Sequence, residues 1–146
     1  MNSIQTETPI VATRVADEKR MNVLPQLFGN YFFKGEALVY GWMDTLSTSY
    51  GGGFWDFYSL SNGGHFMAPQ IAGDARTVQI ESPNGFQVCV SDEAAGLIAC
   101  LFALSNLMFD ISGRGGDTTY LVEQYSLIRA YALEHAEAGA ILTAID

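Results

Sequence analysis

Two histidines are the residues of this chain best suited to metal binding or proton transfer. His65 and His135 stand seventy positions apart, and neither belongs to an H-E-x-x-H or C-x-x-C pattern. We therefore expect no metal site. Both histidines are interpreted as surface residues or as residues whose hydrogen bonds are satisfied within the fold.

The two cysteines are the candidate nucleophiles. Cys89 and Cys100 both lie in apolar periodic stretches, neither has a basic neighbour in sequence to activate it, and no G-x-S-x-G motif is present. We predict two buried, reduced thiols, no catalytic activity and no cofactor. A triad assembled from distant residues stays open, because such groups meet only in the fold.

The segment GRGGDTT, residues 113–119, has the composition of a phosphate-binding loop. It lacks the lysine of G-x-x-x-x-G-K-[ST], and its single base is Arg114. We expect its glycines to end one helix and Asp117 or Thr118 to cap the next. An anion held at that helix N-terminus beside Arg114 stays open.

The stretch GGGFWDFYSLSNGGHFMAP, residues 51–69, gathers aromatic side chains of the kind that stack on nucleic acid bases. The chain has no basic residue between Lys34 and Arg76, so a strand of phosphates would meet no counter-charge there. Strand alternation instead assigns Trp55 and Phe57 to the core. The opposite face, with Asp56 and Tyr58, is then available to a protein partner.

The acidic balance raises the possibility of DNA mimicry, since sixteen acids face seven bases and the net charge is −9. A domain of this length has a diameter of roughly 38 Å. Duplex DNA of that length carries about 22 phosphate charges. The protein supplies less than half of this charge, and its acids are scattered, so we do not expect a DNA mimic.

Sequence periodicity predicts the elements that must position these residues. Apolar residues four positions apart indicate a helix over about 36–49, and a long, almost wholly apolar central helix begins after the N-cap Ser91. Alternation and turn signals predict strands at 54–60, 65–68, 77–81 and 86–90. A last helix is expected over about 117–137, broken by Gly139. The fold class is therefore α+β, a small antiparallel sheet of about four strands in hairpins or a meander, packed with several helices.

The chain is predicted to form one domain over residues 13–146, preceded by a disordered tail over residues 1–12. No uninterrupted apolar run reaches the ~18–20 residues of a membrane span, and the N-terminus has no basic region typical of a signal peptide. We expect a cytoplasmic protein without a membrane partner. Nothing in the sequence indicates the oligomeric state.

Several of these residues carry a family resemblance. The central stretch contains Tyr50, Gly52-Gly53, Trp55, Phe57-Tyr58, Leu60, Gly63-Gly64 and Met67-Ala68-Pro69. Upstream lies the pattern LP-x-LFG at residues 24–29; downstream lie Ser91 with Ala94-Ala95-Gly96, then Ala140-Ile141, Ala144 and Asp146. From about Val15 to the C-terminus the chain resembles the ArdB/KlcA antirestriction family. It departs from the family at Ala136, where relatives can carry proline after His135.

The resemblance implies a plasmid or mobile-element protein that protects incoming DNA by countering host type I restriction-modification enzymes. Such proteins are not regarded as DNA mimics, in agreement with the charge comparison. The partner would be the type I restriction-modification complex, met directly or indirectly. No catalytic residue is carried over from the family.

We accordingly predict a non-catalytic inhibitor that acts through exposed polar residues. The candidate contact residues are Asp56, Tyr58, Arg114, Asp117 and Asp146. Two alternatives stay open. A small enzyme with an unrecognised active site would bring His65 or His135 together with carboxylates. A DNA-binding accessory factor of a mobile element would gather a basic patch from Arg14, Lys19, Arg20 and Lys34.

Overall fold

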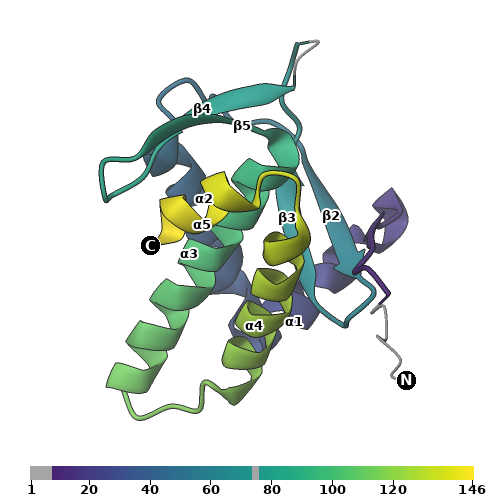
Figure 1. The fold of residues 1–146 in the computed structure, drawn as a ribbon. Coiled ribbons are helices and arrows are strands. Elements are labelled where there is room, and N and C mark those ends of the chain that lie inside the picture. Colours follow the sequence, from purple (N-terminus) through teal and green to yellow (C-terminus); the bar gives the residue numbers. More distant parts are fainter. Residues whose placement is uncertain (1–7, 74–75) are drawn as a thin grey trace, which may run out of the picture.

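The computed structural model describes residues 8–73 and 76–146. Helices and strands alternate in blocks along the chain (Figure 1). The elements in order are β1 (Ala12–Arg14), η1 (Asp17–Asn22), α1 (Val23–Phe28), η2 (Gly29–Tyr31), α2 (Phe32–Leu46), β2 (Trp55–Leu60), β3 (His65–Pro69), β4 (Thr77–Glu81), β5 (Gln87–Ser91), α3 (Asp92–Gly113), α4 (Thr119–Glu134) and α5 (Ala138–Ile145). The predicted α+β class is confirmed.

The first sheet is antiparallel with the strand order β1-β2-β3. The predicted hairpin is confirmed: Trp55 pairs with Pro69 and Ser59 with His65. Its turn closes because Asn62 Oδ1 accepts the backbone N–H of Gly64 at 2.9 Å and Gly63 takes φ +96°. As predicted, Trp55 and Phe57 are buried.

Strand β1 adds to this sheet and begins at Ala12, the last residue of the range expected to be a disordered tail. Ala12 pairs with Leu60, and the backbone N–H of Ile10 donates to Glu134 at 2.9 Å. Residues 10–12 are thus hydrogen-bonded to the rest of the domain. Residues 1–7 of the expected tail lie outside the described part of the chain.

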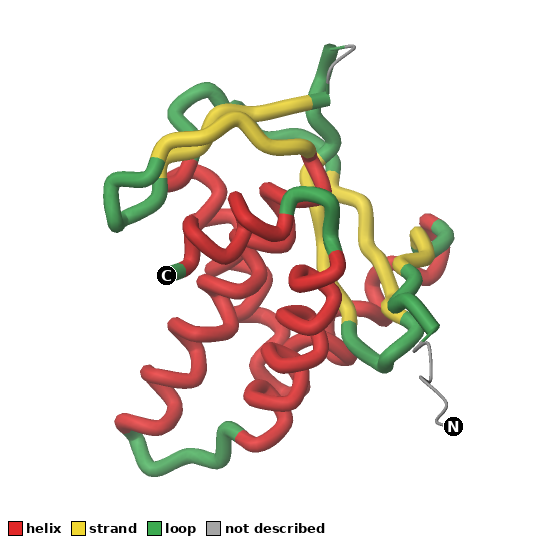
Figure 2. The backbone as a smooth tube through the Cα atoms, in the orientation of Figure 1, coloured by secondary structure: helices red, strands yellow, loops and turns green. Residues whose placement is uncertain are grey.

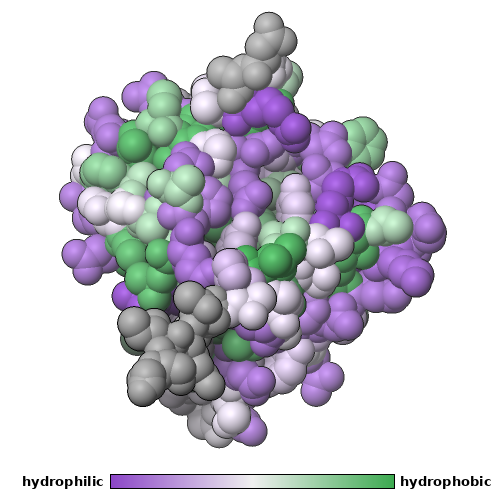
Figure 3. All heavy atoms as spheres, turned by 45° about the vertical axis from the view of Figure 1, so that its right-hand side comes forward, coloured by the Kyte–Doolittle hydropathy of each residue, from purple (hydrophilic) through white to green (hydrophobic). Residues whose placement is uncertain are grey.

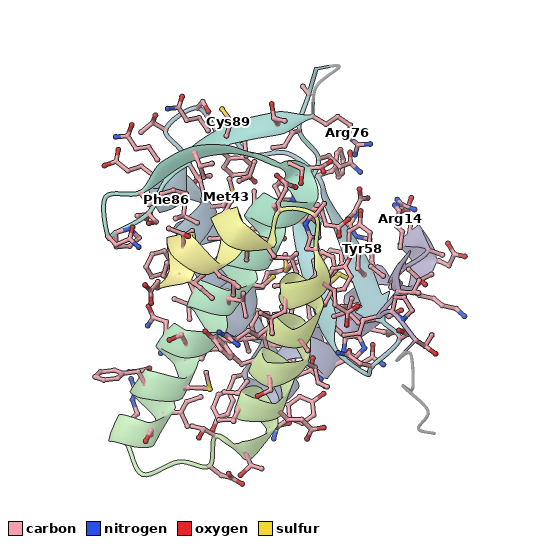
Figure 4. The ribbon with its side chains drawn as sticks, viewed as in Figure 1. Arg14, Met43, Tyr58, Arg76, Phe86 and Cys89 are labelled. Atoms are coloured by element: carbon pink, nitrogen blue, oxygen red, sulfur yellow. The ribbon has the colours of Figure 1, made fainter. Side chains whose placement is uncertain are left out.

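The second sheet is the two-stranded hairpin β4-β5, which arches over the ends of the helices (Figure 2). The prediction of one sheet of about four strands is therefore refined to two sheets, of three and two strands. Val78, Ile80 and Val90 face the core. Cys89 neighbours Val90 in β5, so its side chain points to the opposite face of the sheet and is exposed (Figure 4). The prediction that both cysteines are buried is therefore wrong for Cys89.

Helix α3 is the centre of the core, and Ser91 is its N-cap as predicted, accepting the N–H of Ala94 at 3.1 Å. It is long and apolar enough to cross a membrane, but two thirds of its most apolar stretch is buried inside the domain. Only near its C-terminal end does it expose a large apolar side chain, Phe109, although the apolar pattern of the helix predicts burial there.

Helix α3 also closes the outer edge of β3. The Cys100 thiol lies 3.5 Å from both the backbone nitrogen and the carbonyl oxygen of Met67, so it satisfies both edge groups. Burial raises the pKa of this thiol to about 12. Cys100 is therefore a structural residue.

The last helical segment breaks earlier than predicted. Helix α4 ends at Glu134, where His135 is extended with ψ 148°. Gly139 lies inside α5 rather than at the break. The reason is local: His135 Nδ1 accepts the N–H of Glu137 at 3.0 Å, a contact that a continuous helix would not allow.

Candidate partner-binding face

Strand β2 presents Asp56 and Tyr58 on one side, because residues two apart in a strand point the same way. Asp56 Oδ1 accepts from Arg14 Nε at 2.9 Å and from Gln70 Nε2 at 3.0 Å. Its side chain is only 11% exposed, so Asp56 is a fixed and largely covered carboxylate rather than a freely solvated one.

A row of aromatic rings leads from Tyr58 to the end of α4. Tyr58 stacks on Phe66 of β3, with ring centroids 4.7 Å apart and planes 7° apart. Phe66 stacks on Tyr131 at 5.8 Å, and Tyr131 meets His135 edge-on at 5.9 Å. The row therefore joins the first sheet to the junction between α4 and α5.

The first turn of α3 brings two carboxylates to the same place. Glu93 accepts a hydrogen bond from the Tyr131 hydroxyl, and its carboxylate lies 3.3 Å from Nε2 of His135. Asp92 forms an ion pair with Arg76 at 2.8 Å. Acids in a first helical turn interact favourably with the helix dipole, so their position also supports α3.

The junction between α4 and α5 is tied to the start of α3 through Glu137. Its carboxylate accepts from the backbone N–H of Ser91 at 2.9 Å and from the Ser91 hydroxyl. Both ring nitrogens of His135 lie beside protein groups: Nδ1 accepts from the Glu137 N–H, and Nε2 lies 3.3 Å from the Glu93 carboxylate. This polar cluster is internally satisfied.

We call this surface the Tyr58 face and define it by Arg14, Asp56, Tyr58, Arg76, Asp92, Glu93, Tyr131, His135 and Glu137. Figure 4 shows Arg76, Arg14 and Tyr58 on the same side of the molecule, with Tyr58 close to Arg14. The pKa of the Tyr58 phenol is raised, first by partial burial and then by Asp56, Glu93 and Asp92, with Arg76 acting against them. The phenol therefore stays a neutral hydrogen-bonding group at physiological pH.

The view in Figure 3 brings the β2 side of the molecule forward. Hydrophilic residues there are interspersed with small hydrophobic areas. This composition is typical of a polar protein-binding surface and differs from that of a large apolar interface. An aromatic residue framed by fixed charges is also the arrangement expected of an interface anchor.

The five predicted contact residues do not meet at one site. Only Asp56 and Tyr58 lie on the Tyr58 face. Arg114 follows α3 and lies 3.5 Å from Asp110. Asp117 accepts from the backbone N–H of Thr119 at 2.9 Å and from its hydroxyl, and these bonds lower the Asp117 pKa. Of the two predicted caps, Thr118 occupies the N-cap position of α4, and the Asp117 side chain binds the first N–H of the helix.

The remaining candidate, Asp146, lies at the C-terminus. Its backbone carbonyl accepts from Asn84 Nδ2 at 3.2 Å, and its residue lines a cavity of about 400 Å³ with Tyr125 and Arg129. It is thus anchored against the β4-β5 turn. For all five residues a contact role stays a prediction.

Sequence reasoning missed Glu93 and Glu137 as partners of His135. Such a convergence is what the catalytic alternative requires. A recognisable signal was present, because Tyr131 and His135 stand four apart at the end of a helix and share one face. Here, however, the imidazole and the Ser91 hydroxyl are already occupied by structural hydrogen bonds.

Three of the four basic residues proposed for DNA binding are already held by other groups of the protein. Arg14 contacts Asp17 and Asp56, and Arg20 donates to the carbonyl of Trp55 at 3.0 Å. Lys34 binds Asp110 near the C-terminal end of α3. These contacts neutralise or occupy the three bases, and Lys34 on α2 contacts α3 whereas Arg14 and Arg20 contact β2.

A family model described as antirestriction protein matches residues 48–146. The chain belongs to the antirestriction protein family. An Escherichia coli antirestriction protein KlcA is 47% identical over 149 residues, with both chains fully covered. A second KlcA from the same species is 39% identical over 141 residues, covering 96% of this chain and 97% of the relative.

A solved structure also matches this antirestriction protein along 100% of both chains, with a TM-score of 0.82 and 42% identity. It is described as showing, for the KlcA and ArdB proteins, a novel fold and antirestriction activity against type I DNA restriction systems in vivo but not in vitro. The resemblance and the fold expected from the sequence are confirmed. Except for Arg14, the Tyr58 face lies within the range that the family model matches.

Proposed function

We propose that this protein protects incoming plasmid or other mobile DNA by countering host type I restriction-modification enzymes in the cytoplasm. The observation that carries the proposal is the similarity along the whole chain to a structure described with that activity in vivo. The mechanism is non-catalytic and does not imitate DNA. The charge comparison and the engagement of Arg14, Arg20 and Lys34 by other groups support this part of the proposal.

The Tyr58 face is the surface through which we propose that the protein meets its partner. It combines a half-buried tyrosine with charges that are fixed by hydrogen bonds, so little conformational freedom is lost on binding. The relative's activity in vivo but not in vitro supports an indirect route, in which a cellular component joins the restriction complex and this face.

The test is the plating efficiency of unmodified phage on isogenic cells with and without a type I system. Expression of the protein is expected to raise plating on restricting cells and to leave plating on non-restricting cells unchanged. If restriction is equally strong with and without the expressed protein, the proposed function is wrong.

Two variants test the face within the same assay. Arg76→Glu reverses an exposed charge beside Asp92, and Tyr58→Phe removes the hydroxyl while keeping the ring stack. Both are expected to restore restriction. Arg129→Glu and Tyr125→Phe on α4 are the matched controls and should protect like the wild type. Equal protection by all four folded variants would exclude the Tyr58 face.

A further inference from the structure

Helix α2 carries an exposed row of residues on the side away from the core. Its buried side consists of Gly35, Val39, Met43 and Leu46. From Phe33 onward its exposed residues are Phe33, Lys34, Ala37, Gly41, Asp44 and Thr45, which we call the α2 ridge. Figure 1 shows α2 behind α3, so the ridge belongs to a different side of the molecule from the Tyr58 face.

Two features make the α2 ridge unusual for a solvated helix surface. Phe33 is 84% exposed, although burying such a side chain is worth about 2 kcal/mol. Gly41 sits in the middle of the helix, and a Cβ there would meet nothing within 4 Å, so no contact inside the domain requires glycine. Both features are explained if another helix covers the ridge.

The ridge is self-complementary. Residues three and four apart share a helix face, and a second α2 laid antiparallel reads the same face in reverse. A two-fold axis at the level of Val39 places these residues opposite one another: Phe33 and Thr45, Lys34 and Asp44, Ala37 and Gly41. Each opposition occurs twice, once on either side of the axis. We propose that the protein forms a two-fold symmetric dimer through antiparallel packing of the α2 ridge.

Charge complementarity favours a second copy over other occupants. The axis brings Lys34 of each copy to Asp44 of the other, so the only charged residues of the ridge are paired. Lys34 also binds Asp110 of its own chain. An ammonium has three N–H donors and can hold both carboxylates. Ala37 and Gly41 let the helix axes approach to about 8 Å, where these charges can meet.

The exposed apolar area sets the expected strength. Beside the ridge, Trp42 stacks on Phe102 at 4.3 Å, and both line a cavity of about 250 Å³ together with Phe109. Phe109 is 85% exposed. Phe33 and Phe109 together expose about 340 Å² of each copy. This is less than half of the ~800 Å² per partner of a standard interface, so we expect a weak dimer with Kd roughly 10–100 µM.

Sedimentation velocity on the full-length protein, at concentrations from about 5 to 500 µM, tests the dimer. The wild type is expected to pass from monomer to dimer across this range. Lys34→Glu and Asp44→Lys should each weaken association about 10-fold or more, because two attractive pairs become two repulsive ones. Glu123→Lys on α4 is the control for charge and should leave association unchanged.

An equimolar mixture of the two variants gives the decisive result. A heterodimer of Lys34→Glu with Asp44→Lys has an opposite-charge pair on both sides of the axis, so mixing should restore association to about the wild-type level. Lys34→Glu could fail to fold because it loses the ion pair with Asp110 of its own chain. In that case the association of Asp44→Lys and Gly41→Arg tests the dimer, since both variants keep the Lys34–Asp110 pair. A wild type that stays monomeric, a mixture no more associated than its components, or an Asp44→Lys variant that dimerises normally would each overturn the proposal. The measurement uses no restriction enzyme, so its failure is independent of the proposed function.

Discussion

Replacing Gly96 by alanine is expected to destabilise the protein, although alanine is the better helix former. A Cβ at this position would lie 2.4 Å from the carbonyl oxygen of Met67 and 2.5 Å from Cα of Ala68. Both are backbone atoms of β3, which is held on its other side by β2. Carbon–oxygen contacts normally begin near ~3.3 Å, so α3 would have to move away by roughly 1 Å.

The size of the effect follows from two opposing contributions. Overpacking of this kind costs about 1–3 kcal/mol. It also disturbs the Cys100 contacts with Met67, one helical turn along α3. Better helix propensity returns at most about 1 kcal/mol. We expect the free energy of unfolding to fall by about 2 kcal/mol and Tm by roughly 4–8 °C.

Urea unfolding and scanning calorimetry measure these quantities directly. Gly139→Ala is the matched control: it also lies in a helix, but its added Cβ would meet nothing within 4 Å. That variant should be as stable as the wild type or slightly more stable. If Gly96→Ala is as stable as the wild type, the close approach of α3 to β3 is incorrect. The packing that positions Glu93 at the start of α3 would then be incorrect as well.

Two further predictions concern titratable groups. An aromatic disulfide reagent should label only the Cys89 thiol in the native protein. It should reach Cys100 only after unfolding, because that thiol is buried and its pKa is raised to about 12. Rapid labelling of both thiols in the native protein would contradict this prediction. Burial lowers the pKa of His65 below its ordinary value, so the unfolded chain binds a proton more readily than the folded protein. The folded state is therefore stabilised above pH ~6.5, and this stabilisation is lost as the pH falls below about 6.5. Urea midpoints between about pH 7 and 5 should therefore drop more for the wild type than for His65→Gln, and parallel curves would refute the assignment.

Local patterns were sufficient for the elements whose signals lie within a few residues. The β2-β3 hairpin follows from strand-forming residues around an Asn-Gly turn, and the start of α3 follows from Ser91 with two acids after it. The orientation of Trp55 and Phe57 followed from alternation alone. In each case the deciding contacts are made between neighbours in sequence.

The features that the sequence did not predict depend on partners that are distant along the chain. Strand β1 is short and polar, and it forms only because the edge of β2 lies beside it. Phe109 continues an apolar periodicity, but its side chain is 85% exposed because the described residues do not cover it. The Tyr58 face was predicted only on β2, because its other groups come from segments up to about eighty residues away along the chain.

The junction between α4 and α5 contains the one noted departure from the family pattern, Ala136. The backbone N–H of Ala138 donates to the carbonyl of His135 at 3.0 Å, which closes a four-residue turn. Glu137 has φ −104° and ψ 26°, near the values for the third position of a type I turn. Ala136 is then the second position, where proline is favoured, and the extended His135 already has the conformation that a following proline requires.

Ala136→Pro should therefore stabilise the protein by about 0.4–1 kcal/mol, because it restricts the unfolded chain without straining the folded one. Ala138→Pro is the contrasting variant: it removes the N–H that closes the turn and disfavours the ψ of 26° at Glu137, so it should destabilise. Urea midpoints of the two variants measure the difference. A destabilised Ala136→Pro would mean that the turn is not of this type. It would also leave unexplained how Glu137 is directed back to Ser91 to complete the Tyr58 face.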